Sequence, residues 1–230
     1  EIYTLSLHDA LPISSFYLEF IQKKGQYNMA FPFLGLFIIF LSVAAYYRKR
    51  ATAQQKKVTE DFWNREDQAN QIRRKDISNL PYITIPLEKF PIGISDDEEL
   101  TDYENDLKTL ASRKILNLSH QSNTDLKLAY GPANLPALSE YDQNYTTLLR
   151  NLVAYADCLI KNGFKAEAVP VLEFGISIDS DIRANYTLLA ELYKEQGNAS
   201  KIQELIDKAA SLDSMMRSAI LEQLHTLQNA

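Results

Sequence analysis

The stretch that decides the fold is residues 149–216, which reads LRNLVAYADCLIKNGFKAEAVPVLEFGISIDSDI (149–182) and then RANYTLLAELYKEQGNASKIQELIDKAASLDSMM (183–216). Apolar residues recur in it at helical spacing, and similar residues return after 34 positions. The clearest equivalent pairs are Ala156 and Ala190, Gly163 and Gly197, Gly175 and Ala209, and Asp179 and Asp213. A fixed period of this length is typical of arrays of helix pairs. The sequence therefore predicts two consecutive helical units, 149–182 and 183–216.

This pattern resembles the tetratricopeptide repeat (TPR), in which two antiparallel helices pack through small residues. Ala156 and Ala168 in the first unit and Ala190 in the second stand at the crossing positions of that family. Small residues are needed there because closely packed helix axes leave no room for a long side chain. Ile202 departs from the pattern, since the family has a small residue at its position. The resemblance implies an all-α chain with a TPR-like helical-repeat domain.

In the TPR family the first helices of successive units form a concave face that binds a peptide or protein. Carried over to this chain, that face comprises Arg150, Val153, Asp157, Lys161, Thr187, Glu191 and Lys194. Family members that bind chaperone tails clamp a terminal carboxylate with Lys and Asn, but Asp157 and Glu191 would repel such a ligand. We expect an internal segment, neutral or basic, as the ligand. The alternative is that the chain's own Leu80–Ile94 segment fills the groove.

Two repeats bury little surface by themselves, so flanking elements must cover the ends of the array. Residues 217–230 predict a C-terminal capping helix, because Ile220, Leu224 and Leu227 share one helical stripe. On the other side, residues 80–148 predict an extended Pro-containing segment followed by capping helices. A capping box at Ser95–Glu98 is expected to start one of these helices.

An apolar run, Met29–Tyr47, contains no charged residue and precedes Arg48-Lys49-Arg50. About 19 helical residues reach roughly 28 Å, close to the hydrocarbon thickness of a bilayer. We expect a single transmembrane helix at 29–47, with the C-terminal domain in the cytoplasm because basic residues cluster after the span. A cleaved signal peptide and a buried core helix are the alternatives.

A basic segment follows the apolar run. Residues 48–76 hold nine basic and five acidic residues, whereas residues 77–230 hold 13 basic and 22 acidic ones. We predict a basic juxtamembrane helix over 48–79. Its cations near the membrane are expected to meet anionic lipid headgroups; they are Arg48, Lys49, Arg50, Lys56 and Lys57. A solvated helix, a coiled-coil homodimer through this helix, and a flexible tether remain open.

The first residues are not expected to belong to the folded protein. Residues 1–13, EIYTLSLHDALPI, match the translation of a standard sequencing adapter. Residues 14–28 are interpreted as an untranslated leader, because codons for Lys24-Gly25 can form a ribosome-binding sequence before a start at Met29. Residues 1–28 are therefore expected to be a sequencing artefact followed by an untranslated leader. The alternative for residues 14–28 is a genuine N-terminal extension.

No residues form a recognisable catalytic, metal or cofactor motif. Cys158 is the only cysteine among 230 residues, which excludes a disulfide framework, and it is expected to be a buried packing residue. His120 and His225 have no neighbouring ligand residues in the sequence. The chain has a formal net charge of −6, which does not suit a nucleic-acid binder. We expect a protein that is not an enzyme and needs no cofactor.

The arrangement predicts a membrane-anchored cytoplasmic adaptor or scaffold that binds a peptide or protein through its helical repeats. The alternative is a structural subunit of a larger membrane complex. The whole chain also resembles uncharacterised single-pass membrane proteins of Gram-positive bacteria, a resemblance that implies no activity.

Overall fold

The computed structural model describes the backbone of residues 13–229 and the side chains of residues 33–228. The chain divides into two units, residues 1–64 and residues 65–230. Over the described residues every regular element is a helix, which confirms the all-α prediction. The expected artefact at residues 1–12 lies outside the described residues.

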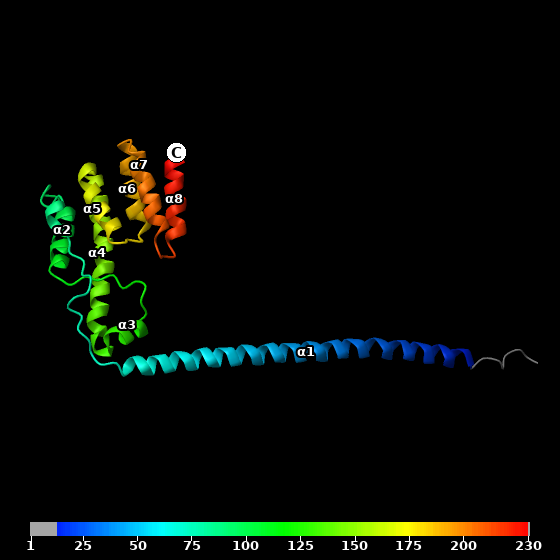
Figure 1. Ribbon diagram of the computed structural model, residues 1–230. Coiled ribbons are helices and arrows are strands. Elements are labelled where there is room, and N and C mark those ends of the chain that lie inside the picture. The colour runs from blue at the N-terminus through cyan, green and yellow to red at the C-terminus, as the bar shows by residue number, and fades with distance from the viewer. Residues whose placement is uncertain (1–12, 230) are drawn as a thin grey trace, which may run out of the picture. The chain divides into compact units, whose positions relative to one another are not determined.

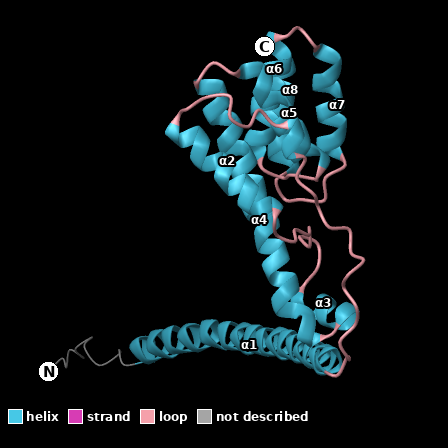
Figure 2. Cartoon of the chain, turned by 90° about the vertical axis from the view of Figure 1, so that its left-hand side faces the viewer, coloured by secondary structure: helices cyan, strands magenta, loops and turns pink. Residues whose placement is uncertain are grey.

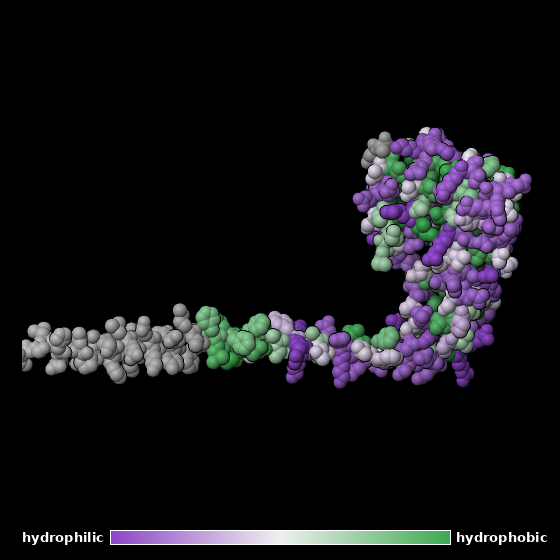
Figure 3. Space-filling view, turned by 180° about the vertical axis from the view of Figure 1, so that it is seen from behind, coloured by the Kyte–Doolittle hydropathy of each residue, from purple (hydrophilic) through white to green (hydrophobic). Residues whose placement is uncertain are grey.

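The first unit consists of the greater part of α1 (Ile13–Asn70). Its side chains from Phe33 to Asn64 are exposed. An apolar band, Phe33–Tyr47, is followed at once by basic residues, as the change from green to purple along this helix shows (Figure 3). Tyr46 and Tyr47 form an edge-to-face pair with ring centroids 5.7 Å apart at the end of the band.

The predicted transmembrane helix at 29–47 is not supported. Among the helices described, none has a stretch that is both long and apolar enough to cross a bilayer.

The second unit contains a row of five helices that follow one another in sequence and in space (Figure 1). They are α4 (Leu135–Lys161), α5 (Lys165–Ser177), α6 (Arg183–Glu195), α7 (Ala199–Ala210) and α8 (Arg217–Asn229). α7 begins one repeat period after α5, and α8 begins one repeat period after α6. The predicted capping helix thus occupies the sequence position of the first helix of a third pair.

The repeat period extends to the hydrogen bonds that end the first helix of each pair. Asn162 N donates to Cys158 O and Gly163 N to Ile160 O, both at 3.0 Å. The same two bonds recur one period later, from Gln196 N to Leu192 O and from Gly197 N to Lys194 O. Gly163 and Gly197 have φ of 89° and 69°, a region that glycine adopts without the steric cost of a β-carbon. These two equivalent glycines therefore make equivalent turns.

Small residues at equivalent places in the two repeat units are buried in the core of the row. Ala156, Ala168 and Ala190 are fully buried, as the alignment of the two units predicted. Ile202, which departs from the small-residue pattern, is also buried and belongs to the same core. The second unit therefore buries a larger side chain at this position of the repeat.

The row begins earlier than predicted. α4 starts at Leu135 and runs without a break through Leu149, where the first repeat unit was expected to begin. The residues before Leu149 keep the same apolar spacing, and Leu138, Tyr145 and Leu148 are buried. The last part of the predicted capping region 80–148, from Leu135 onward, thus belongs to the same helix as the start of the first repeat unit.

Residues 80–94 form no regular element apart from a short 3₁₀ helix, η1 (Leu87–Lys89), and they turn at residues 92–93 before they lead into α2 (Glu98–Ala111). The helix α2 packs on α4 (Figure 2). Its N-cap is Asp97, whose side chain accepts from Leu100 N at 3.0 Å. The capping box expected at Ser95–Glu98 was therefore wrong, because Asp97 supplies the side-chain acceptor instead of Ser95.

The end of α1 belongs to the second unit and binds α3 (Asn123–Tyr130), and the residues that follow α1 bind η2 (Pro132–Asn134). Glu66 forms an ion pair with Lys127 and accepts from Thr124 Oγ1 at 2.8 Å. Asn134 is fully buried and donates to Lys75 O at 2.8 Å. α1 ends at Asn70, so the helix predicted over 48–79 is shorter than expected.

Candidate functional site

A groove of about 870 Å³ lies along α4 and α6 and reaches α8. Five of the seven residues predicted for the concave face line it: Arg150, Val153, Asp157, Thr187 and Glu191. The other lining residues are Ala154, Ile182, Arg183, Ala184, Leu188, Met216 and Gln223. The register of the two repeat units therefore brings most of the predicted face together on one concave surface.

Regular helix geometry explains why these residues face the same way. Arg150, Val153, Ala154 and Asp157 are spaced three, four and seven residues apart on α4, which places them on one helix face. Ala184, Thr187, Leu188 and Glu191 have the same spacing on α6. Each residue of the first set lies one repeat period before its counterpart in the second set. The groove is thus lined by the same face of two equivalent helices, α4 and α6.

The two remaining predicted residues do not line the groove. Lys161 Nζ lies 2.6 Å from Asp157 Oδ2, one helical turn away, and this hydrogen bond raises the pKa of Lys161. Lys194 Nζ donates to Leu227 O at 3.1 Å, near the end of α8. The placement of Lys194 was missed because it depends on α8, whose position cannot be read from the α6 sequence.

The groove is lined by both charged and apolar residues, and its charged residues are the more exposed ones. Val153, Thr187 and Leu188 are half-buried, whereas Arg150, Arg183 and Glu191 are exposed. Within the described part of the chain, no ion pair involves Arg150, Arg183 or Glu191. The groove therefore offers apolar contact area together with charges that a ligand can pair.

The segment 80–94 does not fill the groove. Its Phe90 ring packs edge-to-face on Phe174, with ring centroids 5.7 Å apart, and Pro91 O accepts from Tyr155 Oη at 3.2 Å. Gly93 N donates to the buried carboxylate of Glu104 at 2.8 Å. All of the groove's described lining residues come from 150–157, 182–191, Met216 and Gln223. The segment lies elsewhere, as part of the core under α2.

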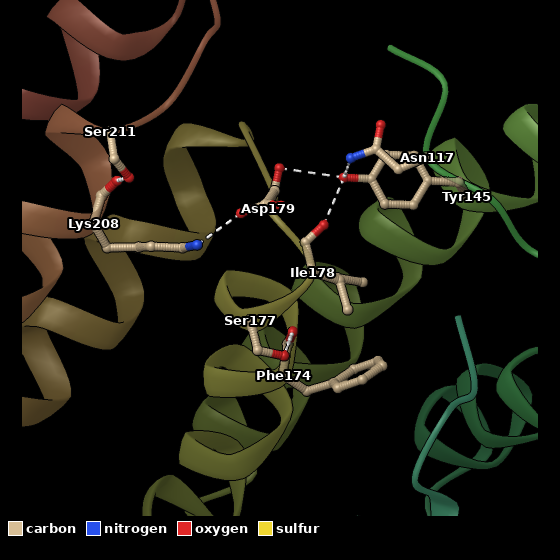
Figure 4. Close-up of polar contacts among 8 residues, drawn as sticks. All are labelled: Asn117, Tyr145, Phe174, Ser177, Ile178, Asp179, Lys208 and Ser211. Carbon is tan, nitrogen blue, oxygen red and sulfur yellow. Dashed lines mark hydrogen bonds and ion pairs between the residues drawn. The ribbon is translucent and has the colours of Figure 1, made fainter. Parts of the chain in front are cut away.

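Polar contacts join the two helix pairs at the turn between α5 and α6 (Figure 4). Tyr145 Oη on α4 donates to Ile178 O at 2.9 Å, and Asn117 Nδ2 donates to the same hydroxyl at 3.0 Å. Lys208 Nζ on α7 lies 2.7 Å from Asp179 Oδ1 in the turn between α5 and α6. α4 and α7 are thereby both tied to this turn.

The residues predicted to meet lipid headgroups lie on α1 and are all exposed: Arg48, Lys49, Arg50, Lys56 and Lys57. Lys56 Nζ is 3.7 Å from Glu60 Oε1, an exposed pair of small energetic weight. These cations form a basic stretch directly after the apolar band Phe33–Tyr47.

The residues that could take part in catalysis or metal binding do not come together in one site. Cys158 is buried, as predicted, and burial raises the pKa of its thiol, which disfavours the reactive thiolate. His120 Nδ1 lies 3.6 Å from Asp213 Oδ2 at an exposed position. Over the part of the chain that the structure describes, no three His, Cys, Asp or Glu side chains could hold a metal ion together.

Comparison with family models, with curated proteins and with solved structures gives no match to this chain.

Proposed function

We propose that this protein is a membrane-anchored adaptor that binds a segment of another protein in the groove along α4, α6 and α8. The observation that carries the proposal is the groove itself, which is open, has a volume of about 870 Å³ and is lined by both apolar and charged residues. Concave sites that combine apolar area with a few polar groups are typical binding sites. Helical arrays present such surfaces to extended partners.

The arrangement of the groove favours a binding role over a purely structural one. A face needed only for packing would be covered by the chain's own residues, but segment 80–94 packs elsewhere. Asp157 and Glu191 hold the positions at which a carboxylate clamp would need donors. We therefore propose an internal segment as the ligand, rather than an acidic chain terminus.

The membrane anchor is proposed on a separate observation. Phe33, Phe37 and Phe40 are 69%, 56% and 65% exposed, and no charged residue interrupts Phe33–Tyr47. Exposed apolar area of this extent is unfavourable in water and marks a surface that contacts lipid or another protein. The basic residues that follow support a location at the cell membrane with the helical domain in the cytoplasm.

A second function, a structural subunit of a larger membrane complex, is favoured by one further observation. Val58, Phe62 and Trp63 on α1 are all more than half exposed, and the two rings form an edge-to-face pair at 5.4 Å. A permanent partner, or a second copy of this helix, would bury this cluster.

A charge-reversal experiment tests the adaptor proposal. The variant Asp157→Lys/Glu191→Lys changes the groove, and Asp102→Lys/Asp207→Lys makes the same change at two exposed carboxylates on α2 and α7. Full-length protein is isolated from native membranes and its co-purifying proteins are compared. The adaptor proposal predicts that one partner is lost from the groove variant alone. An identical partner set at fixed stoichiometry in all three proteins would contradict it and favour the structural subunit.

A further inference from the structure

The charges of the groove separate into two rows because α4 and α6 run in the same direction. Tyr145, early in α4, bonds to Ile178 at the end of α5, so α4 and α5 are antiparallel. Asn185 Nδ2, at the start of α6, donates to Leu172 O late in α5, and Lys165 at the start of α5 pairs with Glu195 at the end of α6. Two antiparallel steps make α4 and α6 parallel, and their equivalent residues lie at equivalent heights.

One end of the groove is cationic and the other is anionic. Arg150 on α4 and Arg183 at the start of α6 line the first end, since Arg183 directly precedes Ala184, the counterpart of Arg150. Asp157 and Glu191, which are counterparts in the two repeat units, line the second end. Between them lie apolar residues, including Val153 and Leu188.

The helix rise fixes the separation of these two rows. Arg150 and Asp157 are seven residues apart and Arg183 and Glu191 eight, which corresponds to about 10–12 Å along a helix. An extended peptide covers about 3.3 Å per residue, so three to four of its residues span this separation.

We infer that the groove recognises a short extended segment with an acidic residue and a basic residue three to four positions apart and apolar residues between them. The acidic side chain pairs with Arg150 and Arg183, and the basic side chain pairs with Asp157 and Glu191. This inference rests on the proposed function and adds to it a defined ligand chemistry. It also revises the expectation of a neutral or basic segment, because that expectation did not include Arg183.

Lys161 competes with the ligand for Asp157 but does not close the anionic end. It lies outside the groove lining, and its side chain is 73% exposed. An exposed pair one helical turn apart contributes little free energy, so a ligand cation replaces it at small cost. Glu191 is engaged by no ion pair among the described residues and remains available to the ligand.

Selection from a library of random ten-residue peptides tests the inference. The library is presented to the full chain in detergent micelles, to Arg150→Glu/Arg183→Glu, to Asp102→Lys/Asp207→Lys, and to Val153→Trp, in which an indole occupies the groove. Circular dichroism verifies that each variant is folded. The unmodified chain and the Asp102→Lys/Asp207→Lys control are expected to enrich peptides with opposite charges three to four positions apart. Arg150→Glu/Arg183→Glu is expected to enrich peptides with basic residues only.

The failures of the inference and of the proposed function are distinguishable. The inference would be overturned if the unmodified chain enriched peptides with only one sign of charge, or peptides with no preferred spacing between acidic and basic residues. Binding in the groove would still stand. Equal recovery on the unmodified chain and on Val153→Trp would mean that the groove binds no segment, and both would fall. For an enriched peptide, moving the two charges to adjacent positions is expected to weaken binding about three- to tenfold.

Discussion

Gly175 on α5 faces Asn185 on α6 so closely that a β-carbon at residue 175 would lie 2.5 Å from Asn185 Oδ1. Asn185 is fully buried, and its Nδ2 donates to Leu172 O at 3.0 Å, so its amide is held in place. The equivalent positions of the next repeat are Ala209 and Ala219. Gly175 thus leaves room for the larger side chain of Asn185, whereas the equivalent positions one period later, Ala209 and Ala219, are both small.

This relationship predicts non-additive effects on stability. Gly175→Ala is expected to destabilise the fold by about 1–3 kcal/mol, because the new methyl overlaps the Asn185 amide. In Gly175→Ala/Asn185→Ala the overlap is absent and the helix gains a better helix former. Denaturant unfolding of the full chain should therefore show that the double variant is more stable than the sum of the two single changes. If the stability changes of the two single variants added up to that of the double variant, the methyl group at residue 175 would not contact Asn185.

The buried alanines of the row make a second prediction. Ala156→Leu and Ala190→Leu are each expected to lower the unfolding free energy by about 1–3 kcal/mol, since a larger side chain at a helix crossing forces the helices apart. Ala166→Leu, at an exposed position on α5, is the control and should change stability by less than about 0.5 kcal/mol. Equal effects at all three positions would contradict the crossing assignment.

The repeat period could be recognised in the sequence because helix pairs impose the same small residues and glycines on each repeat. Element boundaries were less predictable where contacts distant in sequence decide them. No glycine or proline marks the end of α1 at Asn70. Beyond it, Lys75 N donates to Tyr130 O at 3.0 Å and Asn134 donates to Lys75 O, which gives the chain an alternative to helical hydrogen bonds.

The groove was partly predictable for a related reason. Residues at regular helical positions, such as Val153 and Thr187, could be placed by register alone. Arg183 and Met216 line the groove as well, but they lie next to turns whose conformation no local pattern determines. Lys194 was misplaced because its acceptor, Leu227 O, belongs to a different helix, α8.

The ion pair at the end of α1 predicts a pH dependence of stability. Hydrogen bonds from Lys127 and Thr124 lower the pKa of Glu66 below its ordinary value of 4.5. The folded state therefore holds the proton less tightly than the unfolded state, so the pair stabilises the fold above pH 4.5 and loses this effect as the pH falls through the lowered value. Glu66→Gln should be less stable than the unmodified chain at neutral pH, and the difference should shrink in acid.

Glu60→Gln is the matched control, because Glu60 lies on the same helix and pairs with Lys56 at an exposed position. Its stability should follow that of the unmodified chain across the whole pH range. Chemical denaturation at several pH values measures the three proteins. If the stability difference between Glu66→Gln and the unmodified chain did not change with pH, the charge of the Glu66 carboxylate would not contribute to stability.

The proposed membrane location predicts protection of the helical domain. In intact, wall-free cells of the source organism, added protease should leave residues 48–230 uncut, and it should digest them after the membrane is permeabilised. Digestion of the domain in the intact cells would contradict the orientation. Release of the protein from membranes by high salt alone would contradict the anchor at Phe33–Tyr47.

Site-specific photocrosslinking in native membranes tests the central claim most directly, because it reports whether the groove is occupied. A photoreactive amino acid replaces Thr187, which lines the groove, and in a separate protein it replaces Asp207 on the exposed face of α7. The account predicts a discrete crosslinked product from position 187, none from position 207, and loss of that product when Asp157 and Glu191 are changed to Lys. No product from position 187, or the same product from both positions, would contradict it.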